Sequence, residues 1–248
     1  MPRLAALLLL LPLAAPAAEV PGSWTRAWPE TDFSTLRVDP GEIVSGGVPR
    51  DGIPAISGPR MRPAAEETAL DPREPVMALD PDGAPARAYP LRYLTWHEIV
   101  NDTVAGRPIA VTFCPLCNSG LIFDRGVGGR TLEFGVSGML RHSDLIMFDR
   151  QTESWWQQFT GRAIAGELAG ERLEALPATL EGWAQFRDAH PDGLVMAEPE
   201  GHVRDYGENP YTGYDTACPF LYRGEDPPHG IDPVARVLRV GERAWPLS

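Results

Sequence analysis

The sequence contains few cysteines and, beyond its first residues, no long hydrophobic run. Three cysteines stand at positions 114, 117 and 218, too few for the disulfide scaffold of a small secreted domain. An odd number leaves at least one thiol without a partner in the chain. Spanning a bilayer takes about 20 apolar residues, so the sequence predicts no transmembrane segment once the N-terminus is removed.

Several common catalytic signatures are also missing. The chain has no Walker P-loop and no H-E-x-x-H pair. Its Gly-Val-Gly-Gly segment, residues 126–129, lacks the strand-to-helix context of a dinucleotide loop, and Gly-Val-Ser-Gly at 135–138 is not a nucleophile elbow. The sequence therefore predicts neither ATP, nicotinamide nor zinc-protease chemistry.

Basic residues are scarce relative to acidic ones. The chain has 22 Lys and Arg against 34 Asp and Glu, for a net charge of −12. Residues 1–17 hold one base, Arg3, and no acid, so their removal takes the net charge to −13. This charge argues against nucleic acid and anionic lipid as partners. A small molecule, a metal ion or an envelope protein remain as partner classes.

The N-terminus has the pattern of a secretory signal peptide. Arg3 precedes an apolar stretch from Leu4 to Leu13, and small residues follow up to Ala17. The stretch is short for a membrane span, and no cysteine follows to accept a lipid. We therefore expect residues 1–17 to be a signal peptide, cleaved after Ala17 or Ala18, and the mature protein to be periplasmic or secreted.

The remaining chain reads as an arm followed by one domain. Frequent Pro and Gly at residues 19–75 predict an irregular arm wrapped on a core. Residues 76–248 then read as a single α+β domain of mostly antiparallel strands and hairpins, with a few short peripheral helices. An echo of residues 82–91 at residues 239–247 predicts two related strand starts, so we also expect a truncated C-terminus.

Local patterns predict the individual elements. Thr179 is expected to cap a helix, and the adjacent Trp155 and Trp156 are expected to face opposite sides of a strand, one in the core and one at its rim. Asp144, Asp149 and Glu153 read as part of a solvated turn region. The expected strands, helices and hairpins are a strand at 86–91, a short helix at 91–102, a buried strand at 107–114, hairpins within 120–136 and 144–159, a helix at 180–190 and a strand at 194–198.

The segment VTFCPLCNSGLIFDR, residues 111–125, carries the clearest chemical signal. Cys114 and Cys117 stand three positions apart at the end of an apolar, β-branched run. A C-x-x-C pair is able to exchange disulfides, and a proline inside it tunes the potential. Thioredoxin-type catalysis needs a helix at the first cysteine, whereas the residues that follow here predict a turn and a strand.

The same two thiols could clamp a metal ion or catalyse covalently. A soft ion such as copper would be held by Cys114 and Cys117, with His142 as the leading further ligand and His97 and Cys218 behind it. For covalent catalysis Cys114 would be the nucleophile, His142 the base and Asp144 the residue that orients it. The simpler alternative is a structural disulfide, although a ring this small gains little stability from chain entropy.

Longer motifs give the chain a family resemblance. Four stretches carry it: TDFSTLRVDPGEIVSGGVPRDGIPAI, RAYPLRYLTWHEIVNDTVAGRPIAVTFCPLCNSGLIFDR, FGVSGMLRHSDLIMFDRQTESWWQQFTGRAIAG and NPYTGYD. From about Thr31 onward the sequence resembles the bacterial and archaeal domain-of-unknown-function family 3179. The resemblance implies an exported or membrane-associated location, the Cys-Pro-Leu-Cys segment at 114–117 and a chain that often continues past the position of Ser248. It implies no activity, and Cys218 is not part of the pattern.

Two functional interpretations follow from the residues. In the first, Cys114 and Cys117 form a thiol site that binds a soft metal, with copper as the cofactor, or that undergoes redox chemistry. In the second, the protein is a non-enzymatic binding or structural module of the cell envelope with an inert disulfide. Whether the protein is an enzyme stays open between them.

Overall fold

The computed structural model describes residues 19–214, 221–225, 228–231, 235, 237–240 and 243–246. The predicted signal peptide, residues 1–17, and Cys218 both lie outside these residues. Within the described part of the chain, no helix has the length and apolar character needed to cross a membrane.

Three five-stranded sheets form most of the described structure, and we call them sheets A, B and C. Most neighbouring strands are antiparallel, while β2 runs parallel to β6 and β17 parallel to β5. In spatial order, sheet A contains β1 (Ile43–Ser45), β11 (Phe134–Arg141), β12 (Asp144–Asp149), β13 (Trp155–Gln157) and β14 (Arg162–Ala165). Sheet B contains β15 (Ala175–Leu176), β8 (Ser119–Asp124), β7 (Arg107–Cys114), β6 (Ile99–Val104) and β2 (Ile56–Ser57). Sheet C contains β16 (Thr179–Gly182), β4 (Pro75–Leu79), β5 (Arg87–Pro90), β17 (Leu194–Met196) and β3 (Met61–Pro63).

Short helices and two small hairpins complete the described elements. The α-helices are α1 (Gly22–Ala27), α2 (Leu91–His97) and α3 (Trp183–Ala189). The 3-10 helices are η1 (Phe33–Thr35), η2 (Pro40–Glu42), η3 (Ala64–Glu66), η4 (Gln158–Thr160) and η6 (Pro228–Gly230), and the hairpins pair β9 (Gly126–Val127) with β10 (Arg130–Thr131) and β18 (Val237–Val240) with β19 (Arg243–Pro246). The predicted α+β class with mostly antiparallel strands is confirmed.

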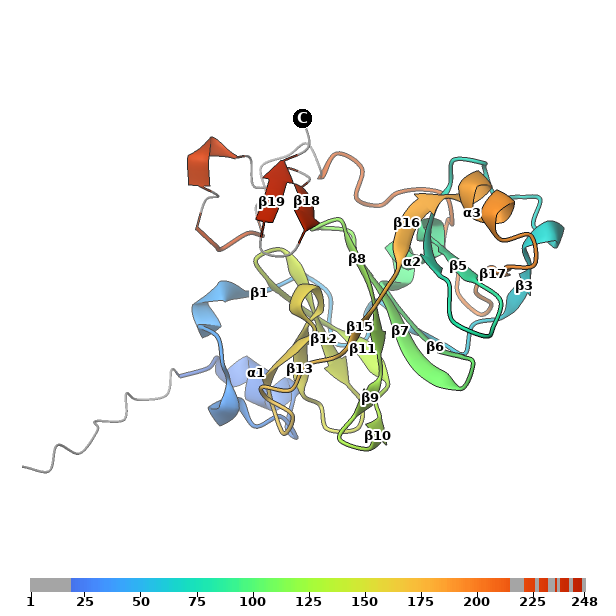
Figure 1. Ribbon diagram of the computed structural model, residues 1–248. Helices are drawn as coiled ribbons and strands as arrows, with labels where there is room; N and C mark the ends of the chain where they lie inside the picture. Colours follow the sequence, from blue (N-terminus) through green and yellow to red (C-terminus); the bar gives the residue numbers. More distant parts are fainter. Residues whose placement is uncertain are drawn as a thin grey trace, which may run out of the picture.

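The sheets stack in layers, with α1 beyond sheet A at one end and α3 beyond sheet C at the other (Figure 1). One apolar layer joins sheets A and B through side chains such as Phe123, Phe134 and Trp156. A second joins sheet B to sheet C and α2, with Val111 and Tyr89 among its members. Sheet B is therefore covered on both faces, which explains why β7 reads as a continuous apolar run.

Residues 19–75 supply one edge strand to each sheet. β1 pairs with β11 at the edge of sheet A, β2 with β6 at the edge of sheet B, and β3 with β17 at the edge of sheet C. Trp24, Trp28 and Phe33 of the same segment pack around Trp155 on the outer face of sheet A. The segment thus covers exposed backbone and apolar surface that the sheets alone would leave open.

Some local predictions agree with the structure. Strand β7 has the predicted bounds, and the predicted hairpin at 144–159 is the β12–β13 pair. The two echoed segments both contain strands, β5 and β19. The Gly-rich tetrad turns only the short β9–β10 hairpin, whereas the longer strands on either side of it, β8 and β11, belong to different sheets.

Three local predictions are wrong. The helix predicted at 91–102 ends at His97, because residues 99–102 belong to strand β6 and pair with β7. Thr179 begins strand β16, and Gly182 is the N-cap of helix α3, because backbone pairing with β4 extends the chain there. Trp155 and Trp156 are both fully buried, since the N-terminal segment covers the outer face of sheet A while sheet B covers its inner face. The two side chains do face opposite sides of the sheet, as predicted, but both faces are covered and neither tryptophan lies at the edge of the core.

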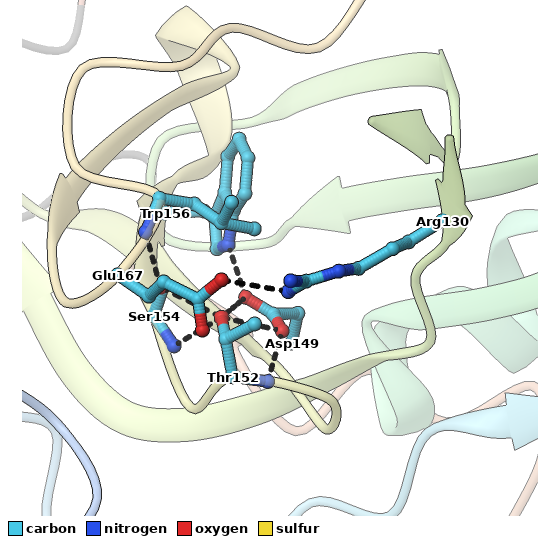
Figure 2. Close-up of polar contacts among 7 residues, drawn as sticks. Arg130, Asp149, Thr152, Ser154, Trp156 and Glu167 are labelled. Atoms are coloured by element: carbon cyan, nitrogen blue, oxygen red, sulfur yellow. Dashed lines mark hydrogen bonds and ion pairs between the residues drawn. The ribbon is translucent and has the colours of Figure 1, made fainter. Parts of the chain in front are cut away.

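The turn after β12 is also more buried than its polar sequence predicts. Asp149 is fully buried and accepts hydrogen bonds from the Thr152 amide and hydroxyl and from Trp156 Nε1 at 2.7–2.9 Å. Figure 2 shows these donors converging on one carboxylate, beside the exposed pair of Arg130 and Glu167. A buried carboxylate is tolerated here because its oxygens are satisfied by donors held on the same hairpin.

We predict that Asp149→Ala lowers the free energy of unfolding by about 3 kcal/mol, because it leaves the Trp156 and Thr152 donors buried without acceptors. Glu167→Ala is the matched control, since it breaks a solvent-exposed ion pair and should cost less than about 1 kcal/mol. Urea unfolding of the two variants beside the wild-type protein measures the difference. Equal losses would show that the buried carboxylate is not a specific stabilising group.

Candidate functional site

The Cys-Pro-Leu-Cys segment forms the turn between strands β7 and β8. Cys114 is the last residue of β7 and pairs with Ser119, the first residue of β8. Pro115 carries no amide hydrogen, so the backbone ladder stops there, and Asn118 closes the connection with a φ of 48° that asparagine tolerates better than most residues. The two cysteines therefore lie at the end of a hairpin and not at a helix N-terminus, as the sequence predicts.

Both thiols meet a carboxylate from the neighbouring sheet. Cys114 Sγ, Cys117 Sγ and a carboxylate oxygen of Asp144 all lie within 4.8 Å of one another. Both cysteines are free thiols. Asp144 is the first residue of β12, so packing of sheet B on sheet A brings together groups that lie about 30 positions apart in sequence.

The three groups differ in exposure and in hydrogen bonding. Cys114 is 1% exposed and its thiol donates to the Ser143 carbonyl at 3.5 Å, whereas Cys117 is only half-buried. Cys117 Sγ lies 3.5 Å from Asp144 Oδ1 and 2.9 Å from Ser119 Oγ. Cys117 is therefore the thiol that an incoming molecule meets first, with Cys114 behind it.

Helix η4 closes the site from the side of β13. Gln158 is fully buried, accepts from the Ser119 hydroxyl at 2.8 Å and donates to the Thr112 hydroxyl at 2.9 Å. The Phe159 amide donates to Asp144 Oδ2 at 3.0 Å. These contacts fix the Asp144 carboxylate and the Ser119 hydroxyl beside the thiols.

Burial makes two acidic groups of this region, Asp144 and Cys114, hard to ionise. It raises the pKa of Asp144 to about 6, against the opposing hydrogen bonds from Phe159, Cys117 and Gln157. It also raises the pKa of the Cys114 thiol well above its ordinary value, and the nearby Cys117, Asp144 and Glu98 add to the effect. The cluster is thus arranged so that a positive charge would relieve an electrostatic penalty.

His142 points to a different partner from the thiols. Its Nε2 lies 3.6 Å from Glu42 Oε2, and its Nδ1 is buried and has no hydrogen-bond partner among the residues that the structure describes. Among the described residues, the group of ligand atoms around the two thiols includes Asp144 and does not include His142. His142 and Ser143 form the two-residue turn between β11 and β12, each with a positive φ, of 54° and 63°. Hairpin turns of this kind favour asparagine and glycine, so the turn beside Cys114 is strained.

His97, the other histidine considered as a ligand, is occupied by structural contacts. Its Nδ1 lies 2.7 Å from the Pro54 carbonyl, so that nitrogen must carry the proton, and its Nε2 accepts from the Tyr206 hydroxyl at 2.6 Å. Burial, with smaller contributions from the neighbouring His202 and Arg204, lowers the pKa of His97 to about 4, against the hydrogen bond to Pro54 that raises it. His97 therefore holds two loops against helix α2 as a neutral ring.

This arrangement predicts a pH-dependent stability. The pKa of His97 is about 4 in the folded protein against 6.5 in a free side chain, so its stabilising contribution is complete above pH 6.5 and is lost as the pH falls towards 4. Relative to His97→Gln, the wild-type protein should lose free energy of unfolding over that range in urea titrations. His190→Gln, the control, should follow the wild-type curve. Parallel curves for wild type and His97→Gln would contradict a buried neutral ring.

Some site residues were not predicted from the sequence. Asp144 was expected to orient His142 or to lie in a solvated turn, whereas it contacts Cys117 directly. The available signal was its position as a single acid at the start of the apolar run Leu145–Phe148. Ser119, Gln158 and Glu98 carry no comparable signal, because their roles depend on packing between distant strands. Cys218 lies outside the described residues.

Comparison with known proteins gives one result. A family model described as "Protein of unknown function (DUF3179)" matches residues 50–248. No curated protein and no solved structure matches the chain.

Proposed function

Because the chain belongs to the family described as protein of unknown function (DUF3179), whose description assigns no chemistry, we propose its function from the site itself: the protein binds one thiophilic metal ion through Cys114 and Cys117. The observation that carries the proposal is the convergence of two free thiols and a buried carboxyl within 4.8 Å. The buried Cys114 and Asp144 are costly to ionise unless a cation accompanies them.

The donor types define which ions fit. Two thiolates suit Cu(I), which accepts soft sulfur ligands and needs few of them. A carboxylate added to two thiolates suits a borderline ion such as Zn²⁺, which completes a tetrahedron with a water molecule or a further ligand. We propose copper as the ion, held by the two sulfurs, with Asp144 beside it as a charge partner. His142 remains a candidate only as an outer neighbour, since its Nε2 faces Glu42.

The metal proposal predicts a specific pattern of variants. Reduced protein should take up one Cu(I) in competition with a chromophoric chelator, and Cys114→Ser or Cys117→Ser should weaken uptake by about 100-fold or more, because each removes one of two soft ligands. Asp144→Asn should change Cu(I) affinity by less than about tenfold but should abolish stoichiometric Zn²⁺ binding. Cys218→Ser is the matched control and should bind as the wild type does.

Each outcome has a definite meaning. Cu(I) uptake that survives the loss of both Cys114 and Cys117 would end the proposal. Strong Zn²⁺ binding that depends equally on Cys114, Cys117 and Asp144 would retain the site but replace copper with zinc. Circular dichroism of each variant separates lost ligation from lost folding.

A second function, thiol–disulfide exchange, is favoured by the unequal exposure of the two thiols. Half-buried Cys117 is placed to attack an external disulfide as its thiolate, which releases one thiol of that partner and leaves a mixed disulfide. Buried Cys114 then displaces the second partner thiol and closes a Cys114–Cys117 disulfide. The pair loses two electrons and two protons, which the partner disulfide accepts as it becomes two thiols.

Trapping distinguishes this function from an inert pair. In a Cys218→Ser background, Cys114→Ser should accumulate a mixed disulfide with glutathione disulfide at Cys117, because the resolving thiol is missing. Cys117→Ser, the matched control, should accumulate much less at buried Cys114. Mass spectrometry of the intact protein measures the amount of glutathione adduct on each variant. A Cys114–Cys117 disulfide that forms once and resists mild reductant would instead support the non-enzymatic envelope module.

The proposed location is the periplasm or the exterior of the cell. It is supported by the signal-peptide pattern of residues 1–17 and by the acidic composition. In an oxidising compartment, the balance between metal-bound and disulfide forms of the pair would depend on metal supply.

A further inference from the structure

A cavity of about 680 Å³ lies next to the thiol cluster. In the described part of the chain its walls come mostly from apolar side chains of sheet A and of the Cys-Pro-Leu-Cys turn, among them Val136, Leu145 and Leu116. Tyr211 and Tyr214 form the opposite wall. A largely apolar cavity of this size with a few polar groups is typical of a small-molecule site.

Glu98 is the buried acid of this cavity. It is 6% exposed, and only one hydrogen bond to its carboxyl is present among the described residues, from the Tyr211 hydroxyl to Oε1 at a long 3.4 Å. No hydrogen bond to the second oxygen, Oε2, is present in that part of the chain, and Oε2 is not among the fully buried unpaired atoms there, so it keeps some accessible surface. Because Glu98 lines the cavity, its carboxyl is placed to bond a polar group of a bound molecule.

Two backbone positions beside the cavity have a positive φ. Glu98 follows helix α2 with a φ of 59°, an uncommon and strained conformation for a residue with a long side chain. Gly138 adopts a φ of 79° in the bulge of β11, which glycine reaches without strain, and a Cβ there would clash with the Val48 carbonyl oxygen. A non-glycine residue held in such a conformation, as Glu98 is, is typical of functional sites.

We propose that this cavity binds a small, predominantly apolar molecule through one carbonyl oxygen, which accepts a hydrogen bond from the Glu98 carboxyl. The apolar walls bury the rest of the molecule. This inference does not require metal or redox chemistry at Cys114 and Cys117, although Leu116 and Leu145 belong to both regions.

The ionisation of Glu98 selects among ligand classes. Burial raises the pKa of Glu98 to about 8, with the Tyr211 hydrogen bond opposing the shift. The carboxyl is therefore protonated at neutral pH and donates to an acceptor, so a neutral carbonyl fits better than an anion. A cationic amine would instead require Glu98 to ionise inside an apolar wall.

The proposal is tested with a matched series of probes: 2-octanone, octane, octanoate and octylamine. Calorimetry or ligand-observed NMR should show 2-octanone binding at a single site, about tenfold or more tighter than each of the other three. Glu98→Gln should retain the ketone within about threefold, because its amide still donates, whereas Glu98→Met should lose the preference for ketone over octane. Val48→Trp, which fills the cavity, should abolish binding of every probe.

The controls separate this proposal from the metal site. The double variant Cys114→Ser, Cys117→Ser should bind 2-octanone as tightly as the wild type, so the two proposals fail independently. Thermal unfolding of Val48→Trp and Glu98→Met checks that each variant is folded. If Glu98→Met does not fold, Glu98→Gln still tests whether a hydrogen-bond donor at position 98 holds the ketone. Tighter binding of octylamine, unaltered binding to Val48→Trp, or no saturable binding of 2-octanone would each overturn the inference.

Discussion

The packing of sheet B on sheet A through one apolar layer is the constraint on which the rest of the structure depends. Side chains of β7 and β8 meet those of β11, β12 and β13 there, and the layer contains Cys114 itself. The same packing places the end of the β7–β8 hairpin against the start of β12. A change in either register would move Cys114 or Asp144 away from the other, because successive side chains of a strand face opposite sides.

The position of the thiols within that packing determines what they are able to do. A hairpin end gives them no helix dipole to stabilise a thiolate, so they differ physically from a thioredoxin-type pair. Burial of Cys114 and Asp144 instead penalises negative charge, which a bound cation would compensate. The partial exposure of Cys117 leaves one approach to the cluster. The two proposed functions, metal binding and disulfide exchange, would therefore compete for the same two thiols.

The buried polar groups of this protein differ in how completely they are hydrogen-bonded. The Asp149 turn satisfies a buried carboxylate with several short hydrogen bonds, and His97 satisfies both of its ring nitrogens. Glu98 and the His142–Ser143 turn are strained or incompletely paired, and they adjoin the cavity and the thiol cluster. Among the described residues, Arg92 Nε, Glu153 Oε2 and Trp155 Nε1 are also buried without a partner, so incomplete pairing alone does not mark a ligand site.

The sequence by itself determined the α+β class, strand β7, the start of helix α2 and the hairpin position of Cys114 and Cys117, because these depend on local periodicity and on turn residues such as Pro115. It placed the end of α2 too late, since residues 99–102 pair with β7. It also singled out the two thiols on which the proposed function rests. The choice of Asp144 over His142 as their neighbour, the full burial of Trp155 and Trp156, and the cavity beside Glu98 were decided only by tertiary structure. Each depends on which faces of distant strands meet, and no local pattern encodes that contact.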